Sequence, residues 1–257
     1  RPPRSTLFPY TTLFRSHMHR VLGDVVLIWL AYTTLATRSL HLESRKVARA
    51  LEAGNIPLAR KTLSRLVSRE TDSLDEKAIV RALLETVSEN MSDGVVAPLF
   101  YLALGGPVLA VAYKAVNTMD SMVGYQNERY SHFGWFAARA DDWVNWIPAR
   151  LTPLLIALAA ACMGLNWRES LRIARRDAKK MKSPNAGYPE GAAAGALGIQ
   201  LGGPSVYFGE VVVKPTLGDP RTALSLQHYR LMVRLLYGTS LCTCFGALAV
   251  RAFLVRW

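Results

Sequence analysis

The sequence predicts an all-α fold, a polytopic integral membrane protein with amphipathic helices outside the membrane. Hydrophobic residues make up 51% of the 257 residues, whereas charged residues make up only 19%, below the roughly 25% of soluble domains. The charges are concentrated between long apolar runs, which is typical of membrane spans joined by polar loops. The net charge of +12 fits the lysine and arginine bias of cytoplasmic loops, since no zinc-finger spacing or RNA-binding aromatic motif accompanies it. We therefore expect a lipid bilayer as a partner and no nucleic acid.

The first 19 residues do not resemble the rest of the chain. They contain the repetitive stretch STLFPYTTLF, show no helical or strand periodicity and lack the long apolar core of a signal peptide. We interpret residues 1–19 as a non-native segment, similar to translated cloning sequence, and residues 20–257 as one membrane domain. The native N-terminus would then be missing or replaced.

Apolar runs define four candidate spans, because a helix needs about 20 apolar residues, and at least about 17, to cross a bilayer. They lie at about 21–37, 94–112, 151–165 and 235–255. The second run contains Gly105, Gly106 and Pro107, so a broken or re-entrant helix is as good an interpretation as a straight span. Asp24, at the start of the first run, requires a polar partner or an interfacial position, and a buried core helix is the alternative there.

The segments between these runs predict polar helices. Residues 38–93 should form a helical hairpin broken at Asn55-Ile56-Pro57, then a helix from about Asp75 to Asn90 with Asp72 or Ser73 as its N-cap. Residues 166–182 should form a basic amphipathic helix that lies on anionic lipid or attracts an anionic substrate. The lysine and arginine distribution places the loops 38–93 and 167–235 in the cytoplasm.

Carboxylates gather at the end of the helix that precedes the second span. Glu85 and Glu89 are four residues apart on one helical face, and Asp93 lies just beyond. Two carboxylates at this spacing can share a Mg²⁺ ion when substrate or water supplies further oxygens. The alternative is a solvated helix end, although carboxylates are unfavourable at a helix C-terminus.

A polar stripe follows the second span, in the segment AYKAVNTMDSMVGY. Lys114, Asn117 and Ser121 share a helical face beside the membrane, and Asp120 lies next to them. Each polar group costs free energy there unless it is paired or wetted. The stripe predicts a substrate or phosphate site at the membrane edge, or else a solvated interfacial helix.

Two further motifs carry polar groups. In DDWVNWIPAR, Asp141, Asp142 and Asn145 are followed by Arg150, and the tryptophans suit a membrane interface; a salt-bridged entry to the next span is the alternative. In SPNAGYPEGAAAGALGIQLGG, turn residues precede Glu190. The Ala/Gly run after it allows very close helix packing, or forms a glycine-rich anion loop.

Together with SENMSDG (88–94), these motifs resemble the CobD/CbiB family of cobalamin biosynthesis, over about Val21 to the C-terminus. The resemblance implies a multi-pass protein of the bacterial inner membrane. It also implies the ATP-dependent joining of (R)-1-amino-2-propanol, or its O-phosphate, to a propionate of adenosylcobyric acid, which gives adenosylcobinamide or its phosphate. ATP and Mg²⁺ would be the cofactors, and a complex with other corrinoid-assembly membrane enzymes is a further expectation. One departure is the start of the chain, where only Leu22-Gly23-Asp24 matches the family's usual opening.

Roles for individual residues follow as hypotheses from this resemblance and from the chemistry of the side chains. The catalytic candidates are Lys114, Asp120, Asp142 and Glu190. The candidate metal ligands are Glu85, Glu89 and Asp93. The substrate-binding candidates are Asn90, Asn117, Ser121, Tyr125, Asn145, Arg150, Ser183 and Asn185.

Two other functions compete with the enzyme. One is a non-catalytic membrane sensor or regulator like the AmpE-like proteins, and the other is a transporter, for which the chain lacks an inverted repeat. The enzyme hypothesis meets one difficulty in the topology. Four simple spans would place residues 114–145 and residues 183–190 on opposite sides of the bilayer, unless 94–112 is re-entrant or 191–203 is inserted in the membrane.

Overall fold

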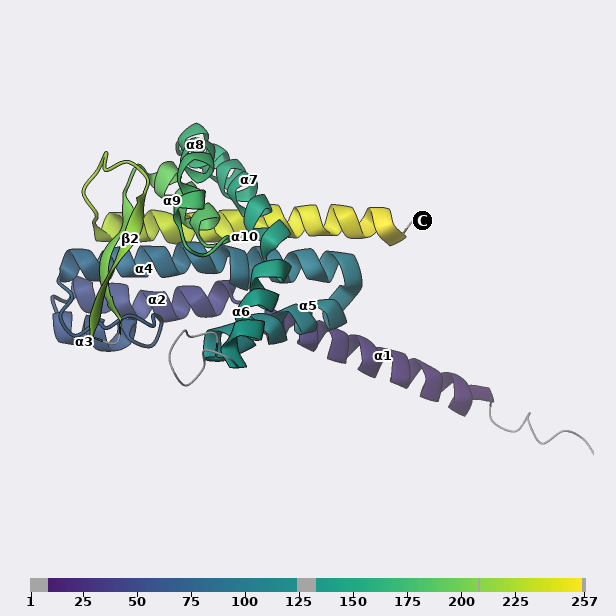
Figure 1. The fold of residues 1–257 in the computed structure, drawn as a ribbon. Helices are drawn as coiled ribbons and strands as arrows, with labels where there is room; N and C mark the ends of the chain where they lie inside the picture. Colours follow the sequence, from purple (N-terminus) through teal and green to yellow (C-terminus); the bar gives the residue numbers. More distant parts are fainter. Residues whose placement is uncertain (1–8, 124–132, 208, 256–257) are drawn as a thin grey trace, which may run out of the picture.

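The computed structural model describes residues 9–123, 133–207 and 209–255, and helices dominate them, which confirms the predicted all-α class (Figure 1). The elements are α1 (Pro9–Thr34), α2 (Thr37–Glu52), α3 (Ile56–Leu63), α4 (Glu76–Met91), a π-helical turn η1 (Ser92–Val96), α5 (Ala97–Val123), α6 (Phe133–Val144), α7 (Trp146–Cys162), α8 (Trp167–Asp177), a 3₁₀ turn η2 (Ala178–Lys180), α9 (Gly187–Leu197), β1 (Leu201–Tyr207), β2 (Glu210–Leu217) and α10 (Leu226–Val255).

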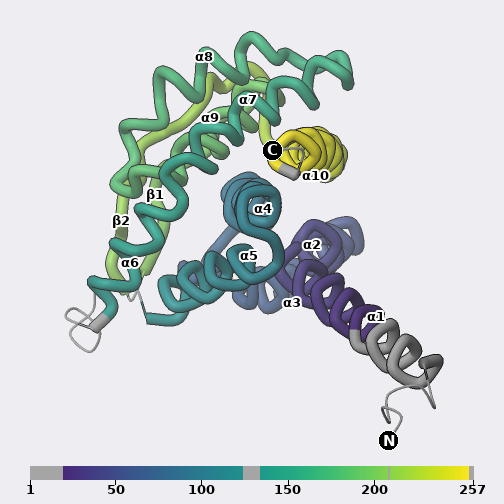
Figure 2. The backbone as a smooth tube through the Cα atoms, turned by 90° about the vertical axis from the view of Figure 1, so that its right-hand side faces the viewer, coloured from purple at the N-terminus to yellow at the C-terminus, as the bar shows by residue number. Residues whose placement is uncertain are grey.

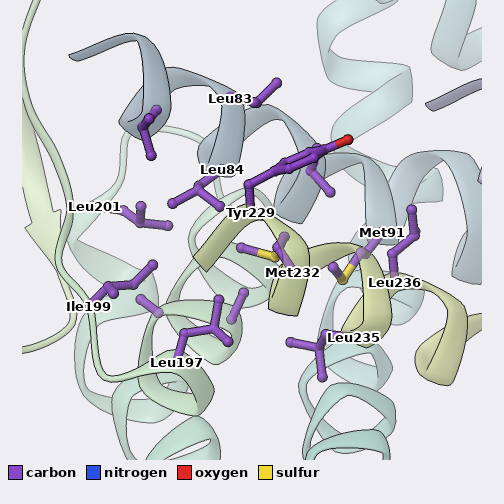
Figure 3. Packing of buried hydrophobic residues seen from close by; sticks show 14 of the residues in the cluster. Leu83, Leu84, Met91, Leu197, Ile199, Leu201, Tyr229, Met232, Leu235 and Leu236 are labelled. Atoms are coloured by element: carbon purple, nitrogen blue, oxygen red, sulfur yellow. The ribbon is translucent and has the colours of Figure 1, made fainter. Parts of the chain in front are cut away.

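Helix α4 lies in the middle of the fold, with α10, α2 and α5 around it (Figure 2). Its side chains are apolar on more than one face, so Leu83, Leu84 and Met91 are fully buried and pack near Met232 and Leu235 of α10 (Figure 3). A helix that is buried on several sides needs a well-satisfied start. The cap is Asp75, whose carboxylate accepts a hydrogen bond from the backbone N–H of Ala78 at 2.8 Å, so the prediction of Asp72 or Ser73 as cap was wrong.

Helix α5 is broken at Gly105 and Gly106, as the broken-helix interpretation predicted. Gly106 has φ +69°, and Pro107 lacks the N–H that would continue the helix. The chain reverses at this point, so the second half of α5 runs back beside the first (Figure 1). The rings of Tyr101 and Tyr113, one from each half, stack with centroids 5.1 Å apart.

Helices α6 to α9 and the β-hairpin arch over one side of this bundle (Figure 2). The contact between α8 and α9 is very close because glycines on α9 face the α8 backbone. A Cβ atom at Gly195 would lie 2.3 Å from the carbonyl oxygen of Glu169, and one at Gly187 would lie 2.3 Å from that of Ala178. The close packing predicted for the Ala/Gly run is therefore present.

The antiparallel hairpin of β1 and β2 was not predicted. Its register pairs Gly203 with Lys214 and Tyr207 with Glu210, with an irregularity at Gly202. The β-branched run Val211–Val213 was the available signal. It was missed because the preceding residues, up to Gly203, were interpreted as an Ala/Gly run that either packs closely as a helix or forms a glycine-rich anion loop.

Three helical stretches are long and apolar enough to cross a membrane: Arg20–Glu52, Glu76–Val123 and Leu226–Leu254. A fourth arises if α6 and α7 count as one span bent by 47°. The predicted runs 21–37 and 94–112 lie within the first two stretches, 235–255 lies within the third except for its last residue, and 151–165 overlaps α7. The chain is a helical membrane protein.

Candidate functional site

A polar cavity of about 530 Å³ lies where α4, η1 and the end of α5 meet the segment that follows α3. Residues 65–68 form one wall. The other walls carry six residues that the sequence had singled out: Glu89, Asn90, Asp93, Asn117, Asp120 and Ser121. Two separate motifs, 88–94 and 112–125, therefore contribute to one site.

The π-helical turn η1 shapes the α4 side of this cavity. A π turn inserts an extra residue into a helix and leaves a backbone group without its usual partner, and such turns are frequent at functional sites. Here the carbonyl oxygen of Gly94 accepts a hydrogen bond at 2.9 Å from the backbone N–H of Ala36, between α1 and α2. Asp93 is thereby held at the cavity by backbone geometry.

Behind the cavity, hydrogen bonds join α5 to α6. The Lys114 ammonium donates to Oδ1 of Asn117 at 2.9 Å, and Nδ2 of Asn117 donates to Oδ1 of Asp141 at 3.1 Å. The Tyr113 hydroxyl donates to Oδ1 of Asn145 at 2.9 Å. Since Asn117 and Asn145 are nearly fully buried, these bonds fix the amides that the sequence predicted as substrate ligands.

A second set of bonds joins the end of α6 and the start of α7 to the turn before α9. Nδ2 of Asn185 donates to the backbone carbonyl of Asp142 at 2.9 Å, and Nη1 of Arg150 donates to Oδ1 of Asn185 at 3.2 Å. The Arg150 guanidinium also lies over the rings of Trp146 and Tyr188, at 4.3 and 4.8 Å. The motifs at 141–150 and 183–190 are thus in contact. The reversal in α5 removes the conflict between these motifs that four simple spans created.

Glu85 belongs to a buried ion pair rather than to the cavity wall. One carboxylate oxygen is 2.5 Å from the Arg69 guanidinium, and the other accepts from the backbone N–H of Gly202 at 2.8 Å. Arg69 also donates to Oγ of Ser205 at 3.2 Å. Burial opposes the charge on Arg69, but the Glu85 carboxylate outweighs it and raises the pKa of Arg69. Both oxygens of Glu85 therefore have partners that attach the β-hairpin to α4.

Glu190, at the start of α9, is buried beside this pair. Burial raises the pKa of the Glu190 carboxyl well above its usual range, and the nearby Glu89 and Glu85 carboxylates raise it further. Lys214 and Arg69 act in the opposite direction without cancelling this effect. A carboxyl with a pKa raised by burial and by like charges is a candidate for proton transfer.

Several predicted site residues form side-chain hydrogen bonds to backbone groups two to four residues away. The Ser183 hydroxyl accepts from the backbone N–H groups of Asn185 and Ala186, Ser121 donates to the carbonyl of Asn117, and Asn90 donates to that of Thr86. The Asp142 carboxylate is partly exposed and lies 3.8 Å from Arg139. Tyr125 lies outside the described residues.

Sequence reasoning assigned no role to four residues that the structure connects to the site: Tyr113, Asp141, Arg69 and Lys214. Tyr113 and Asp141 stood inside motifs already singled out. Tyr113 is one helical turn before Asn117, and this spacing was the available signal. Arg69 and Lys214 lie in segments with no distinguishing pattern.

Glu89, Asp93 and Asp120 all line one cavity, and carboxylate oxygens suit Mg²⁺. Within the part of the chain that the structure describes, no three His, Cys, Asp or Glu residues are grouped closely enough to hold a metal on their own. Mg²⁺ is commonly held by one or two carboxylates together with substrate phosphates, so these residues fit a metal that arrives with a phosphorylated substrate.

By its fold and site, the chain is a helical membrane protein with a polar, carboxylate-lined cavity beside a helix that breaks and reverses at Gly105 and Gly106. Residues 5–236 match the family described as CobD/CbiB protein, so the chain belongs to this family; the matched range begins within the segment 1–19 that we had set apart. Three proteins named Cobalamin biosynthesis protein CobD are similar to it. That of Geobacter metallireducens is 56% identical over 87% of this chain and 70% of the relative. That of Pelobacter propionicus is 53% identical over 93% and 74%, and that of Clostridium perfringens is 47% identical over 91% and 74%. No solved structure matches the chain.

Proposed function

We propose that this protein acts in cobalamin biosynthesis, as an enzyme of the inner membrane that joins (R)-1-amino-2-propanol or its O-phosphate to adenosylcobyric acid. The reaction forms an amide between the amine and a propionate carboxylate and uses ATP. Membership of the CobD/CbiB family and the names of its relatives support the pathway. The observation that carries the reaction type is the cavity that Glu89, Asp93 and Asp120 line beside Asn117 and Lys114.

The chemistry asks for groups of this kind. A carboxylate is a poor acceptor for an amine until one oxygen is converted into a leaving group, and transfer of the ATP γ-phosphoryl group to that oxygen achieves this. Mg²⁺, when bound with the nucleotide, neutralises the phosphate charge. One or two of the carboxylates of Glu89, Asp93 and Asp120 would hold that ion together with the phosphates, and Lys114 would contact a phosphate or the carboxylate.

The amine must lose protons to become an amide nitrogen. Glu190 is our candidate for the group that accepts one, because it is a buried carboxyl beside Glu89, and its raised pKa makes the ionised carboxylate a stronger base. Asp142 is the alternative acceptor, but its carboxylate is more exposed and faces Arg139. Asn145 and Asn185, both buried and fixed by hydrogen bonds, would bind the amides at the rim of the corrin.

The test is a synthesis assay on the purified protein in lipid. Adenosylcobyric acid, aminopropanol phosphate and ATP with Mg²⁺ are supplied, and the amide product and ADP are measured by mass spectrometry. We expect product only when all three substrates are present. Absence of product from a protein with an intact thermal transition would contradict the proposal, and ADP without amide would indicate a nucleotide-hydrolysing membrane protein instead.

Matched variants test the site within the same assay. Glu89→Gln and Asp120→Asn keep the side-chain shape and remove the charge, so we expect product formation to fall at least about tenfold, the effect of 1.4 kcal/mol in the barrier. Glu43→Gln, in an exposed ion pair with Lys46, is the control and should retain activity. Full activity in both site variants would remove the cavity from the mechanism.

A further inference from the structure

Helix α6 exposes large aromatic side chains and turns a carboxylate toward the protein, which is the opposite of a helix in water. Trp135, Phe136 and Trp143 are 61, 69 and 83% exposed. At 100° per residue these positions lie within about 100° of one another on the helix. The opposite face carries Ala137, which is buried, and Asp141, whose carboxylate bonds to Asn117. A soluble amphipathic helix shows the reverse arrangement.

The exposed aromatic face continues into α7. Asn145 separates the two helices, which meet at 47°, and Trp146 and Ile147 at the start of α7 are 55 and 49% exposed. Two shallow hollows of about 620 and 490 Å³ run along this surface and share Arg139 and Trp143. The surface is therefore continuous from α6 to a helix whose composition fits a membrane span.

Its chemistry matches the boundary between lipid headgroups and acyl chains. Tryptophan is enriched at that depth because its ring is apolar and its indole N–H needs a polar partner. Arg139 lies between the rings and is 3.8 Å from Asp142, so its charge can reach the headgroups while its stem covers apolar surface. The bilayer core would suit the aromatic rings but not Arg139.

We propose that α6 is an in-plane anchor, with the face formed by Trp135, Phe136, Arg139 and Trp143 at the headgroup boundary of the bilayer, and that it does not form part of a span. The bend at Asn145 then marks the entry of α7 into the membrane. Because the other face of α6 supplies Asp141 to the hydrogen bonds behind the cavity, the anchor places the candidate site at headgroup depth. This inference rests on the membrane class of the protein and not on the proposed reaction.

Depth-dependent fluorescence quenching tests the proposal. A variant that keeps Trp143 and has phenylalanine at every other tryptophan is placed in phosphatidylcholine vesicles whose acyl chains carry bromine either near the headgroup or near the chain end. We expect a larger loss of Trp143 fluorescence with the shallow bromines. A larger loss with the deep bromines would mean that α6 spans the membrane and would overturn the proposal.

Absence of quenching by either lipid would also overturn it, in favour of a face that binds a corrinoid or another protein. The matched control keeps only Trp167 of α8, which is 41% exposed on a different helix; a response equal to that of Trp143 would show that the signal is not specific to α6 and would likewise count against the anchor. If the single-tryptophan chain lacks a thermal transition, a spin label at Phe136→Cys, with serine at the native cysteines, gives the same depth from its accessibility to oxygen and to a water-soluble nickel complex.

Discussion

The buried pair of Arg69 and Glu85 gives a sharp prediction about stability. Their side chains are 7 and 4% exposed, and each has a further partner in β1. Removing one charge leaves the other buried without a counterion, which costs about 3–5 kcal/mol. We therefore expect Arg69→Met and Glu85→Gln each to lower the free energy of unfolding by this amount. At about 2–4 °C per kcal/mol for a chain of this size, the midpoint should fall by about 6–20 °C.

The double variant isolates the interaction energy between Arg69 and Glu85 from the energies of their other contacts. Arg69→Met with Glu85→Gln leaves no uncompensated charge, and the glutamine carbonyl can still accept from the Gly202 N–H. We expect the double variant to be less destabilised than the sum of the single variants, by about 1–3 kcal/mol. Thermal unfolding in one detergent, followed by tryptophan fluorescence, measures all three.

The exposed pair of Lys46 and Glu43 is the control, with side chains 53 and 44% exposed. Lys46→Met should change the stability by less than about 1 kcal/mol, because solvent screens the pair. The reasoning is refuted if Arg69→Met costs no more than Lys46→Met, or if the two single effects at Arg69 and Glu85 simply add.

Three further predictions concern the hairpin, the acid side of the stability profile and the site. Gly202→Ala should lower the free energy of unfolding by several kcal/mol more than Gly209→Ala. Both residues have positive φ, but only at Gly202 would a Cβ lie 2.1 Å from a carbonyl oxygen of β2. Equal losses in thermal unfolding would refute the contact. Burial opposes the charge of Asp177, but hydrogen bonds from a guanidinium, an ammonium and a backbone N–H outweigh it and hold the pKa of Asp177 below its usual range. The stability that Asp177 contributes is therefore present above its unfolded pKa of about 3.9 and is lost as the pH falls through the folded value, and Asp177→Asn should flatten unfolding profiles in this acid range. Asp141→Ala should lower the rate of amide synthesis about tenfold or more, since a hydrogen bond to a charged group is worth about 1.5–3 kcal/mol. Asp142→Ala should lower it less. The reverse order in the synthesis assay would show that we have assigned the two aspartates wrongly.

The membrane class, the break in the second apolar run and the close packing of the Ala/Gly run could be predicted, because each depends on local chemistry. Gly106 provides the positive φ, Pro107 lacks a donor, and glycines four residues apart leave one helical face bare. The prediction of the α4 N-cap was wrong because Asp72, Ser73 and Asp75 can all cap a helix, and the choice among them depends on where the helix packs.

At the site, the sequence identified the segments, while the three-dimensional arrangement selected the residues. Asp141 and Asp142 are adjacent, and one step along a helix turns a side chain by 100°. The position of α6 against α5 decides that Asp141 is the one that bonds to Asn117, whereas Asp142 lies near Arg139 of its own helix, three residues before it. Glu85 and Glu89 share a helical face as predicted, but the partners of Glu85 come from residues 69 and 202, which no spacing rule connects to it.

The helical class, the membrane location and the CobD/CbiB motifs could all be predicted before the fold was known, because composition, periodicity and motifs are properties of short segments. The contacts among the motifs at 112–125, 141–150 and 183–190, in contrast, depend on how distant helices pack. These contacts depend on the direction in which the chain leaves Gly105 and Gly106. Those glycines reveal that the helix breaks, but the packing of Tyr113 against Tyr101 and Asn145 determines where the second half goes.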